Sequence, residues 1–289
     1  MNLRPIRERA RAAATVARLP LRAGAWAGAA GSVLGRGTGS SIDFQDQRHY
    51  VPGDDPRHIN WQAYARTGAY TMKLYREEVS PRIDLVLDQT GSMHLDDAKE
   101  NRAWELTYFC IESGLRLGGH VMLHVLGRTA AEPPTEWPLE RALADEWPER
   151  VGAAEPVALA DQLGRVPLRS GSLRVLVSDL LDASPPARVV AALTGGRGRG
   201  IVLAPFARSE SAPDWDGNVD FEDAESGGRS RQHVSPATLA RYRDAYRRHF
   251  ALWREESVRR GVAFARVADA GDLLAALRGE AVPAGAIEM

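Results

Sequence analysis

The stretch RIDLVLDQTGSM, Arg82 to Met93, decides the fold of this chain. Its apolar run, Leu85 to Leu87, predicts a short strand that is buried on both faces. The run ends at Asp88, and the residues after it are turn-formers. From about Asp97 to Leu117 apolar residues recur at helical spacing. A strand, a polar turn and a helix in this order predict the first crossover of an α/β sheet.

Side-chain oxygens occupy every second position of the polar turn, at Asp88, Thr90 and Ser92. In α/β sheets ligands collect at the carboxyl ends of the strands, so we expect these three residues at a ligand-binding edge. A second buried strand, Leu173 to Ser178, also ends in an aspartate, Asp179. The alternative is a purely structural role, in which Asp88 caps the following helix and Ser92 accepts hydrogen bonds from the first amides of that helix.

Composition bounds the possible functions. With 289 residues, 44% of them hydrophobic, and a net charge of −1, the chain suits one large core or one core with an appendage. This charge balance implies no nucleic-acid partner. Of the 37 basic residues only Lys73 and Lys99 are lysine, which we attribute to GC-rich coding. The single cysteine, Cys110, excludes an internal disulfide and favours a cytoplasmic location.

The first 40 residues are rich in Ala and Arg and resemble a transit peptide. An amphipathic helix explains them better, because apolar residues share one face: Ile6, Ala10, Ala13, Val16 and Leu19. Gly31 to Ser41 is typical of a connector and lacks the Lys-Ser or Lys-Thr of a phosphate-binding loop. No apolar run is long enough to predict a transmembrane helix.

Strands and helices alternate beyond the first crossover, which predicts a central, mostly parallel sheet with helices on both faces. The expected strands are 120–126, 173–178, 201–204 and 262–267, and the expected helices are 157–166, 186–193, 239–253 and 271–277. Residues 129–156 read as loop with short helices, and 214–231 as an exposed hairpin or loop. His120 and His124 share a strand face but offer too few ligands for zinc.

The segment before the first strand is turn-rich and carries the pattern R-x-Y-x-P-G-D-D-x-R-x-I-x-W-x-x-x-A-R, Arg48 to Arg66. Opposite charges crowd this region, at Arg48, Asp54, Arg57, Arg66 and Glu77. They favour a structural ion-pair network over a partner-binding edge. The pattern, with the strand that ends in Asp88 and Ser92-Met93, resembles the bacterial family called domain of unknown function 58.

The resemblance implies a von Willebrand factor A-like, doubly wound sheet and association with MoxR-type AAA+ ATPases. It also implies a metal-ion-dependent adhesion site, with Mg²⁺ or another divalent cation held by Asp88, Thr90, Ser92 and Asp179. Two departures stand against the metal. Glu155 to Ala158 supplies no threonine where the family pattern has one, and Leu180 replaces the glycine after the third-loop aspartate.

We therefore expect an N-terminal helix and connector (1–41), a signature segment packed on the core (42–79) and a von Willebrand factor A-like domain (80–289). The expected function is a non-catalytic interaction module, an adaptor of a MoxR-type ATPase in the assembly or maturation of a protein complex. Docking would use the metal or, without it, the surface from Thr90 to His94. The alternative is a metal-dependent hydrolase that uses Asp88 and Asp179.

Overall fold

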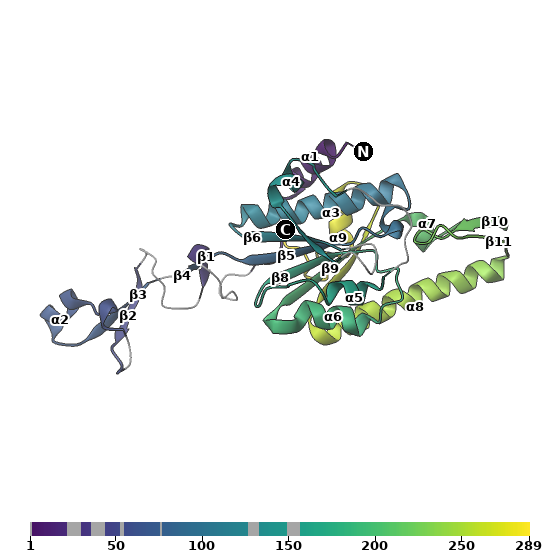
Figure 1. Cartoon of the computed structure of the whole chain (residues 1–289). Helices are drawn as coiled ribbons and strands as arrows, with labels where there is room; N and C mark the ends of the chain where they lie inside the picture. The colour runs from purple at the N-terminus through teal and green to yellow at the C-terminus, as the bar shows by residue number, and fades with distance from the viewer. Residues whose placement is uncertain are drawn as a thin grey trace. The chain divides into compact units, whose positions relative to one another are not determined.

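The computed structural model describes residues 2–21, 30–35, 44–52, 55–75, 77–126, 133–148 and 157–289 (Figure 1). The chain forms two compact units. Unit 1 comprises Met1–Pro20, Arg82–Arg116 and His120–Met289, and unit 2 comprises Leu21–Pro81 and Leu117–Gly119. Unit 1 holds the central sheet. In the sequence, unit 2 is almost entirely an insertion between α1, the first helix of unit 1, and the first strand of the central sheet.

Unit 1 contains a six-stranded sheet with the strand order β12-β9-β8-β5-β6-β7. The strands are β5 (Arg82–Leu87), β6 (His120–Val125), β7 (Thr135–Trp137), β8 (Leu173–Val177), β9 (Arg199–Phe206) and β12 (Ala263–Ala268). All neighbours pair in parallel except β7, which is antiparallel to β6. The predicted α/β class with a mostly parallel central sheet is confirmed.

The direction of winding reverses at β5. From β5 the chain runs outward to β6 and β7, and it then crosses back to β8 on the other side before continuing to β9 and β12. The register of Leu87 opposite Val177 places the carboxyl ends of β5 and β8 next to each other. Such a reversal leaves a crevice outside the strand ends, where ligands bind in open α/β sheets.

Helices cover both faces of the sheet. Figure 1 places α3 (Asp97–Arg116) on one face and α5 (Leu159–Leu163), α6 (Pro186–Thr194) and α8 (Pro236–Arg260) on the other. The other α-helices in the described part of unit 1 are α1 (Arg4–Ala13), α4 (Leu139–Leu143), α7 (Arg208–Ser211) and α9 (Leu273–Gly279). Helix α8 begins at the Ser235 side-chain cap and ends at Gly261 in the left-handed conformation, which explains its sharp boundaries.

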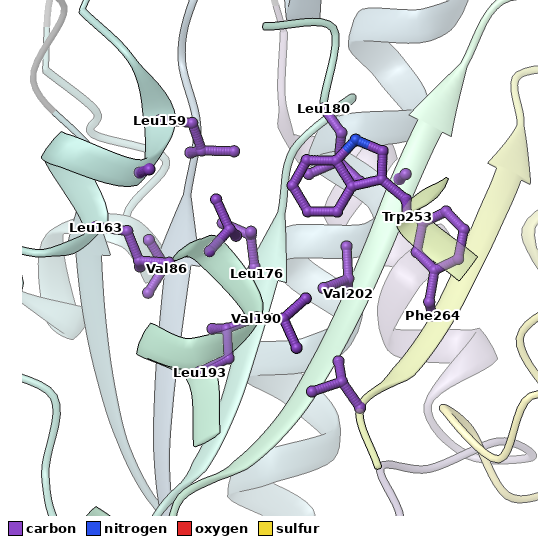
Figure 2. Close-up of a cluster of buried hydrophobic side chains, with 14 of the residues drawn as sticks. Val86, Leu159, Leu163, Leu176, Leu180, Val190, Leu193, Val202, Trp253 and Phe264 are labelled. Carbon is purple, nitrogen blue, oxygen red and sulfur yellow. The ribbon is translucent and has the colours of Figure 1, made fainter. Parts of the chain in front are cut away.

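One apolar core cluster lies between the sheet and the α5, α6 and α8 face. Val86, Leu176 and Val202 reach it from neighbouring strands, and the Trp253 indole of α8 lies beside Leu180 (Figure 2). Trp253 is completely buried. Burying one such large side chain stabilises the fold by roughly 1.5–3 kcal/mol. This core fixes the strand ends that carry the candidate site.

Helix α1 buries Ile6, Ala10 and Ala13 as predicted, but it ends at Ala13. Val16 is therefore off the buried face and is 50% exposed. Leu19 is buried beyond the helix, where its amide donates to Ser113 Oγ of α3 over 2.8 Å. Strand β7 was not predicted, because it is only three residues long and follows a proline-rich stretch.

Unit 2 contains two small antiparallel sheets. Strand β1 (Ala30–Gly35) pairs with β4 (Glu77–Val79), and β2 (Phe44–His49) pairs with β3 (Thr71–Tyr75). The prediction of a connector at 31–41 is wrong for the part that forms β1, and residues 36–41 lie outside the described residues.

Two short helices complete unit 2, the 3-10 helix η1 (Pro56–His58) and α2 (Trp61–Thr67). Asn60 caps α2 by accepting from the Ala63 amide. Of the predicted ion-pair residues, Arg57 pairs with Asp55 over 2.6 Å, and Asp54 lies outside the described residues. The predicted packing of this segment on the core stays a prediction. In the described part of the chain, no helix has the length and apolar character needed to cross a bilayer.

Candidate functional site

Asp88 leaves the end of β5 with both carboxylate oxygens engaged. Its Oδ2 accepts from Ser178 Oγ over 2.7 Å, and its Oδ1 accepts from the Thr90 amide over 3.0 Å. These bonds tie the ends of β5 and β8 together and close the turn that follows β5. Burial, and secondly the charge of Asp179, raise the pKa of Asp88 to about 6.

Thr90 and Ser92 lie on the same edge, with their hydroxyl oxygens 3.4 Å apart. Between them starts a short 3-10 helix, η2 (Gly91–His94). Asp179 follows β8, and its amide contacts the sulfur of Met93 over 3.1 Å. The four residues predicted as a cation site are therefore brought to the carboxyl ends of two adjacent strands, at the point where the winding reverses.

A buried lysine, Lys99, which was not predicted as a site residue, lies at this edge. Lys99 lies in the first turn of α3 and is completely buried. Its Nζ donates to Asp179 Oδ2 over 2.7 Å and to Oε1 of Glu210, from α7, over 2.5 Å. Burial alone would lower the pKa of Lys99, but the two carboxylates outweigh burial and raise it. Lys99 is thus a permanent internal cation.

The donor set does not fit a divalent cation as it is arranged. Mg²⁺ needs oxygen ligands in an octahedron. Both oxygens of Asp88 already accept hydrogen bonds, and those of Asp179 accept from Lys99 and from the Leu181 amide. No group of three or more His, Cys, Asp or Glu able to hold a metal exists among the described residues. The predicted Mg²⁺ site stays a prediction. In the structure the negative charge of Asp179 is balanced by Lys99.

A carboxylate from a distant hairpin lies on the same loop. The hairpin consists of β10 (Gly217–Glu222) and β11 (Arg229–Val234), as predicted for this region. In its turn, Glu225 accepts from the amides of Gly91 and Ser92 over 3.1 and 2.9 Å. A Cβ on Gly91 would lie only 1.8 Å from the carbonyl oxygen of Ala224. Position 91 therefore needs glycine because the hairpin turn approaches the loop so closely.

Leu180, which follows Asp179, has a backbone conformation that is unusual for leucine. Its φ is +61°, the left-handed conformation that favours glycine, so the backbone is strained there. The Leu180 side chain is completely buried in the core beside Trp253 (Figure 2). Its carbonyl accepts from His249 Nε2 of α8 over 2.8 Å. Core packing and this hydrogen bond hold the strained loop in place.

Lys99, Glu210 and Glu225 complete the site, and sequence reasoning missed all three. One indication for Lys99 exists in the composition, because arginine fills nearly every other basic position. The Lys99 ammonium is a compact point charge, and it contacts both buried carboxylates here. Neither glutamate carries a comparable indication, because both reach the site through tertiary contacts.

Together these features define an α/β protein with a charged, closed loop cluster at the switch point of its sheet. The chain belongs to the family described as protein of unknown function DUF58, whose model matches residues 46–252. It is 30% identical over 250 residues to uncharacterized protein Rv1480 of Mycobacterium tuberculosis and to uncharacterized protein Mb1516 of Mycobacterium bovis. Each alignment covers 79% of this chain and 74% of the relative. No solved structure gives a significant match.

Proposed function

We propose that this protein is a non-catalytic interaction module that docks on a MoxR-type AAA+ ATPase and acts as its adaptor in the assembly or maturation of a protein complex. The docking surface is the loop from Thr90 to His94 with its neighbour Leu95. Docking on this surface needs no metal ion. The proposal includes a von Willebrand factor A-like fold, which is supported by the winding reversal at β5 and the single antiparallel edge strand β7.

The observation that carries the proposal is that the chain itself supplies both charges of an adhesion-type contact. Such a contact places a cation at the strand ends and an acidic group of the partner on that cation. Here Lys99 is the cation beside Asp179, and Glu210 is the acidic group on that cation. Glu225 adds a second acidic group, on the loop amides. Because the chain itself occupies the positions of the cation and the acidic group, a partner can recognise only the shape of the loop and its exposed apolar side chain, Leu95, which is 48% exposed.

The test is capture of a purified MoxR-type ATPase from the same organism, with the full chain as bait. We expect equal capture with and without a chelator. Asp88→Asn should also capture normally, because asparagine keeps the shape of the turn but lacks the charge that a cation needs. Leu95→Glu should abolish capture by placing a charge in the docking surface.

Leu252→Glu on α8 is the matched control, because Leu252 is likewise an exposed leucine, at 58%. It should leave capture unchanged. Capture that disappears with chelator would restore the metal-bridged mode. No capture under any condition would remove the adaptor function itself.

The hydrolase alternative makes an opposite prediction. Two carboxylates at the strand ends could hold a catalytic metal only if Lys99 left Asp179. Turnover of a nucleotide or phosphoester by the pure protein with added Mg²⁺ or Mn²⁺, lost in Asp88→Asn, would establish the enzyme and overturn the adaptor proposal.

A further inference from the structure

The outer face of α8 is an exposed surface that the proposed docking function does not use. Helix α8 forms the outside of unit 1 on its side of the sheet (Figure 1). Its inner face packs into the apolar core through Tyr246, Phe250 and Trp253. The outer face holds a stripe of exposed residues at positions i, i+3, i+4, i+7 and i+10, which are Arg248, Ala251, Leu252, Glu255 and Val258.

The apolar members of this stripe project into solvent. Leu252 is 58% exposed, and Val258 is 74% exposed, the largest value among the large apolar side chains of the described residues. Ala251 beside them is exposed as well, and a residue this small lets a second helix approach closely. Scattered apolar residues are ordinary on a protein surface, so the charges that flank them are more informative.

Two opposite charges flank Leu252. Arg248 lies one turn before it and Glu255 one turn after it. Both side chains are exposed, and neither has a hydrogen-bond or ion-pair partner among the described residues. Arg248 and Glu255 are roughly 10 Å apart along the helix axis, so they do not pair with each other.

The neighbouring charges of α8 are already engaged within the chain. Asp244, which could reach the arginine, pairs instead with Arg247. Arg259, which could reach the glutamate, pairs instead with Glu256. The arginine and the glutamate of the stripe are therefore left for a partner from outside.

The stripe is complementary to itself in the antiparallel direction. Arg248 and Glu255 lie equally far from the point midway between Ala251 and Leu252. A two-fold axis through that point places Arg248 of one copy opposite Glu255 of the other, and the reverse. The two leucines and the two alanines then meet beside the axis, between the two charge pairs.

We propose that the outer face of α8 binds the same face of a second copy of this chain, with the two helices antiparallel. A second copy is the occupant because one stripe carries both charges of the contact at matching distances from a single point. The apolar contact extends from Ala245, which is exposed, to Val258, roughly 20 Å along the axis. A contact of this size predicts a weak and reversible dimer.

Self-association through α8 is separate from docking on the ATPase, which uses the loop after β5. Leu252→Glu places a charge beside the two-fold axis and should weaken the dimer. The same variant should still capture the ATPase.

The test is sedimentation velocity of the full chain between about 10 μM and about 1 mM, a range that covers weak contacts. The sedimentation coefficient should rise with concentration toward that of a dimer. Arg248→Glu and Glu255→Arg should each raise the dissociation constant at least about tenfold, because each places like charges opposite each other at both ends of the contact. Neither substitution should change the melting temperature, because both side chains are exposed.

Mixing the two variants tests the pairing directly. In the mixed dimer both acidic positions come from the Arg248→Glu chain and both basic positions from the Glu255→Arg chain, so every contact is again between opposite charges. The mixture should therefore associate at least as tightly as the wild type. The double variant Arg248→Glu/Glu255→Arg should also regain the wild-type affinity, because it exchanges the charges within both contacts.

Arg278→Glu is the matched control, because it makes the same charge change at an exposed arginine of α9. It should leave association unchanged. Wild-type protein that stays monomeric up to about 1 mM would overturn the proposal. Two other results would also overturn it: a mixture of the two variants that does not associate, or an equal weakening by Arg278→Glu, which would show that net charge controls association.

Discussion

The ammonium of Lys99 lies 2.7 Å from Asp179 Oδ2, so the aspartate that ends β8 is neutralised by a side chain from the helix that follows β5. The same ammonium reaches Glu210 on α7. One lysine therefore joins three segments of unit 1 at the carboxyl edge of the sheet. Removing it would leave two carboxylates buried without a cation.

Lys99→Met should lower the free energy of unfolding by about 3–5 kcal/mol, the usual cost of breaking a buried ion pair from one side. Urea denaturation measures this. Arg188→Met is the matched control, because Arg188 also contacts an aspartate, Asp161, over 2.7 Å, but both side chains are exposed. Its cost should stay below about 1 kcal/mol. Equal effects of the two substitutions would show that Lys99 has no special role.

Asp88→Asn should stabilise the protein at pH 8 and lose this advantage as the pH falls. Because the folded-state pKa of Asp88 is raised from 3.8 to about 6, its contribution to stability is full below pH 3.8 and is lost as the pH rises through 6. Asparagine mimics the protonated acid, so the gain at pH 8 should be on the order of 2–3 kcal/mol. Denaturation at pH 5 and pH 8 measures the difference.

Asp84→Asn, on the same strand, is expected to act in the opposite direction. Burial opposes ionisation of Asp84, but contacts with His124, Ser172 and Arg169 outweigh burial and lower its pKa. Its charge therefore stabilises the fold at neutral pH, and this stability is lost as the pH falls through the lowered pKa. Destabilisation by Asp88→Asn at pH 8 would contradict the environment described for Asp88.

Glu225→Gln should loosen the loop after β5. The glutamate accepts two amides, from Gly91 and Ser92, and glutamine keeps only one acceptor oxygen, without charge. Amide hydrogen exchange at these two positions should accelerate about tenfold, as expected for losing a bond to a charged group. Glu222→Gln, which breaks only the exposed pair with Arg229, is the control. Unchanged exchange in Glu225→Gln would rule out the hairpin contact in solution.

Titration with Mg²⁺ or Mn²⁺ should give no saturable heat, and a chelator should not change the melting temperature. The physical reason is that Lys99 already neutralises Asp179 and that both oxygens of Asp88 accept hydrogen bonds. Calorimetric titration of the wild-type protein measures whether Mg²⁺ or Mn²⁺ binds. Saturable binding that Asp88→Ala abolishes would reinstate the cation site derived from the sequence.

The sheet was predictable because its central strands contain continuous apolar runs. Leu85 to Leu87 and Val175 to Val177 are both completely or almost completely buried, and each is followed by a polar loop. Sheet pairing then brings Asp88 and Asp179 to the same edge, which their positions in the sequence already implied.

The partners of Asp179 were not predictable, because they come from far along the chain. Lys99 is separated from Asp179 by 80 positions and from Glu210 by 111. Helical periodicity marks α3 as amphipathic, yet charged residues of this helix are buried as well, Lys99 against Asp179 and Glu210, and Arg102 against the loop after β12. Whether a charged side chain is buried depends on which element packs over it, and the local sequence does not indicate which element that is.

The first and last segments of unit 1 are joined by a pair of backbone hydrogen bonds between Arg18 and Glu288, 2.7 and 2.8 Å long. Residue 18 is synthesised long before residue 288, and the strands of the central sheet lie between them in the chain, so these hydrogen bonds can form only after those strands have been made. Until then the segment after α1 lacks this pairing. Closure of unit 1 around its first segment is therefore a late step of its folding.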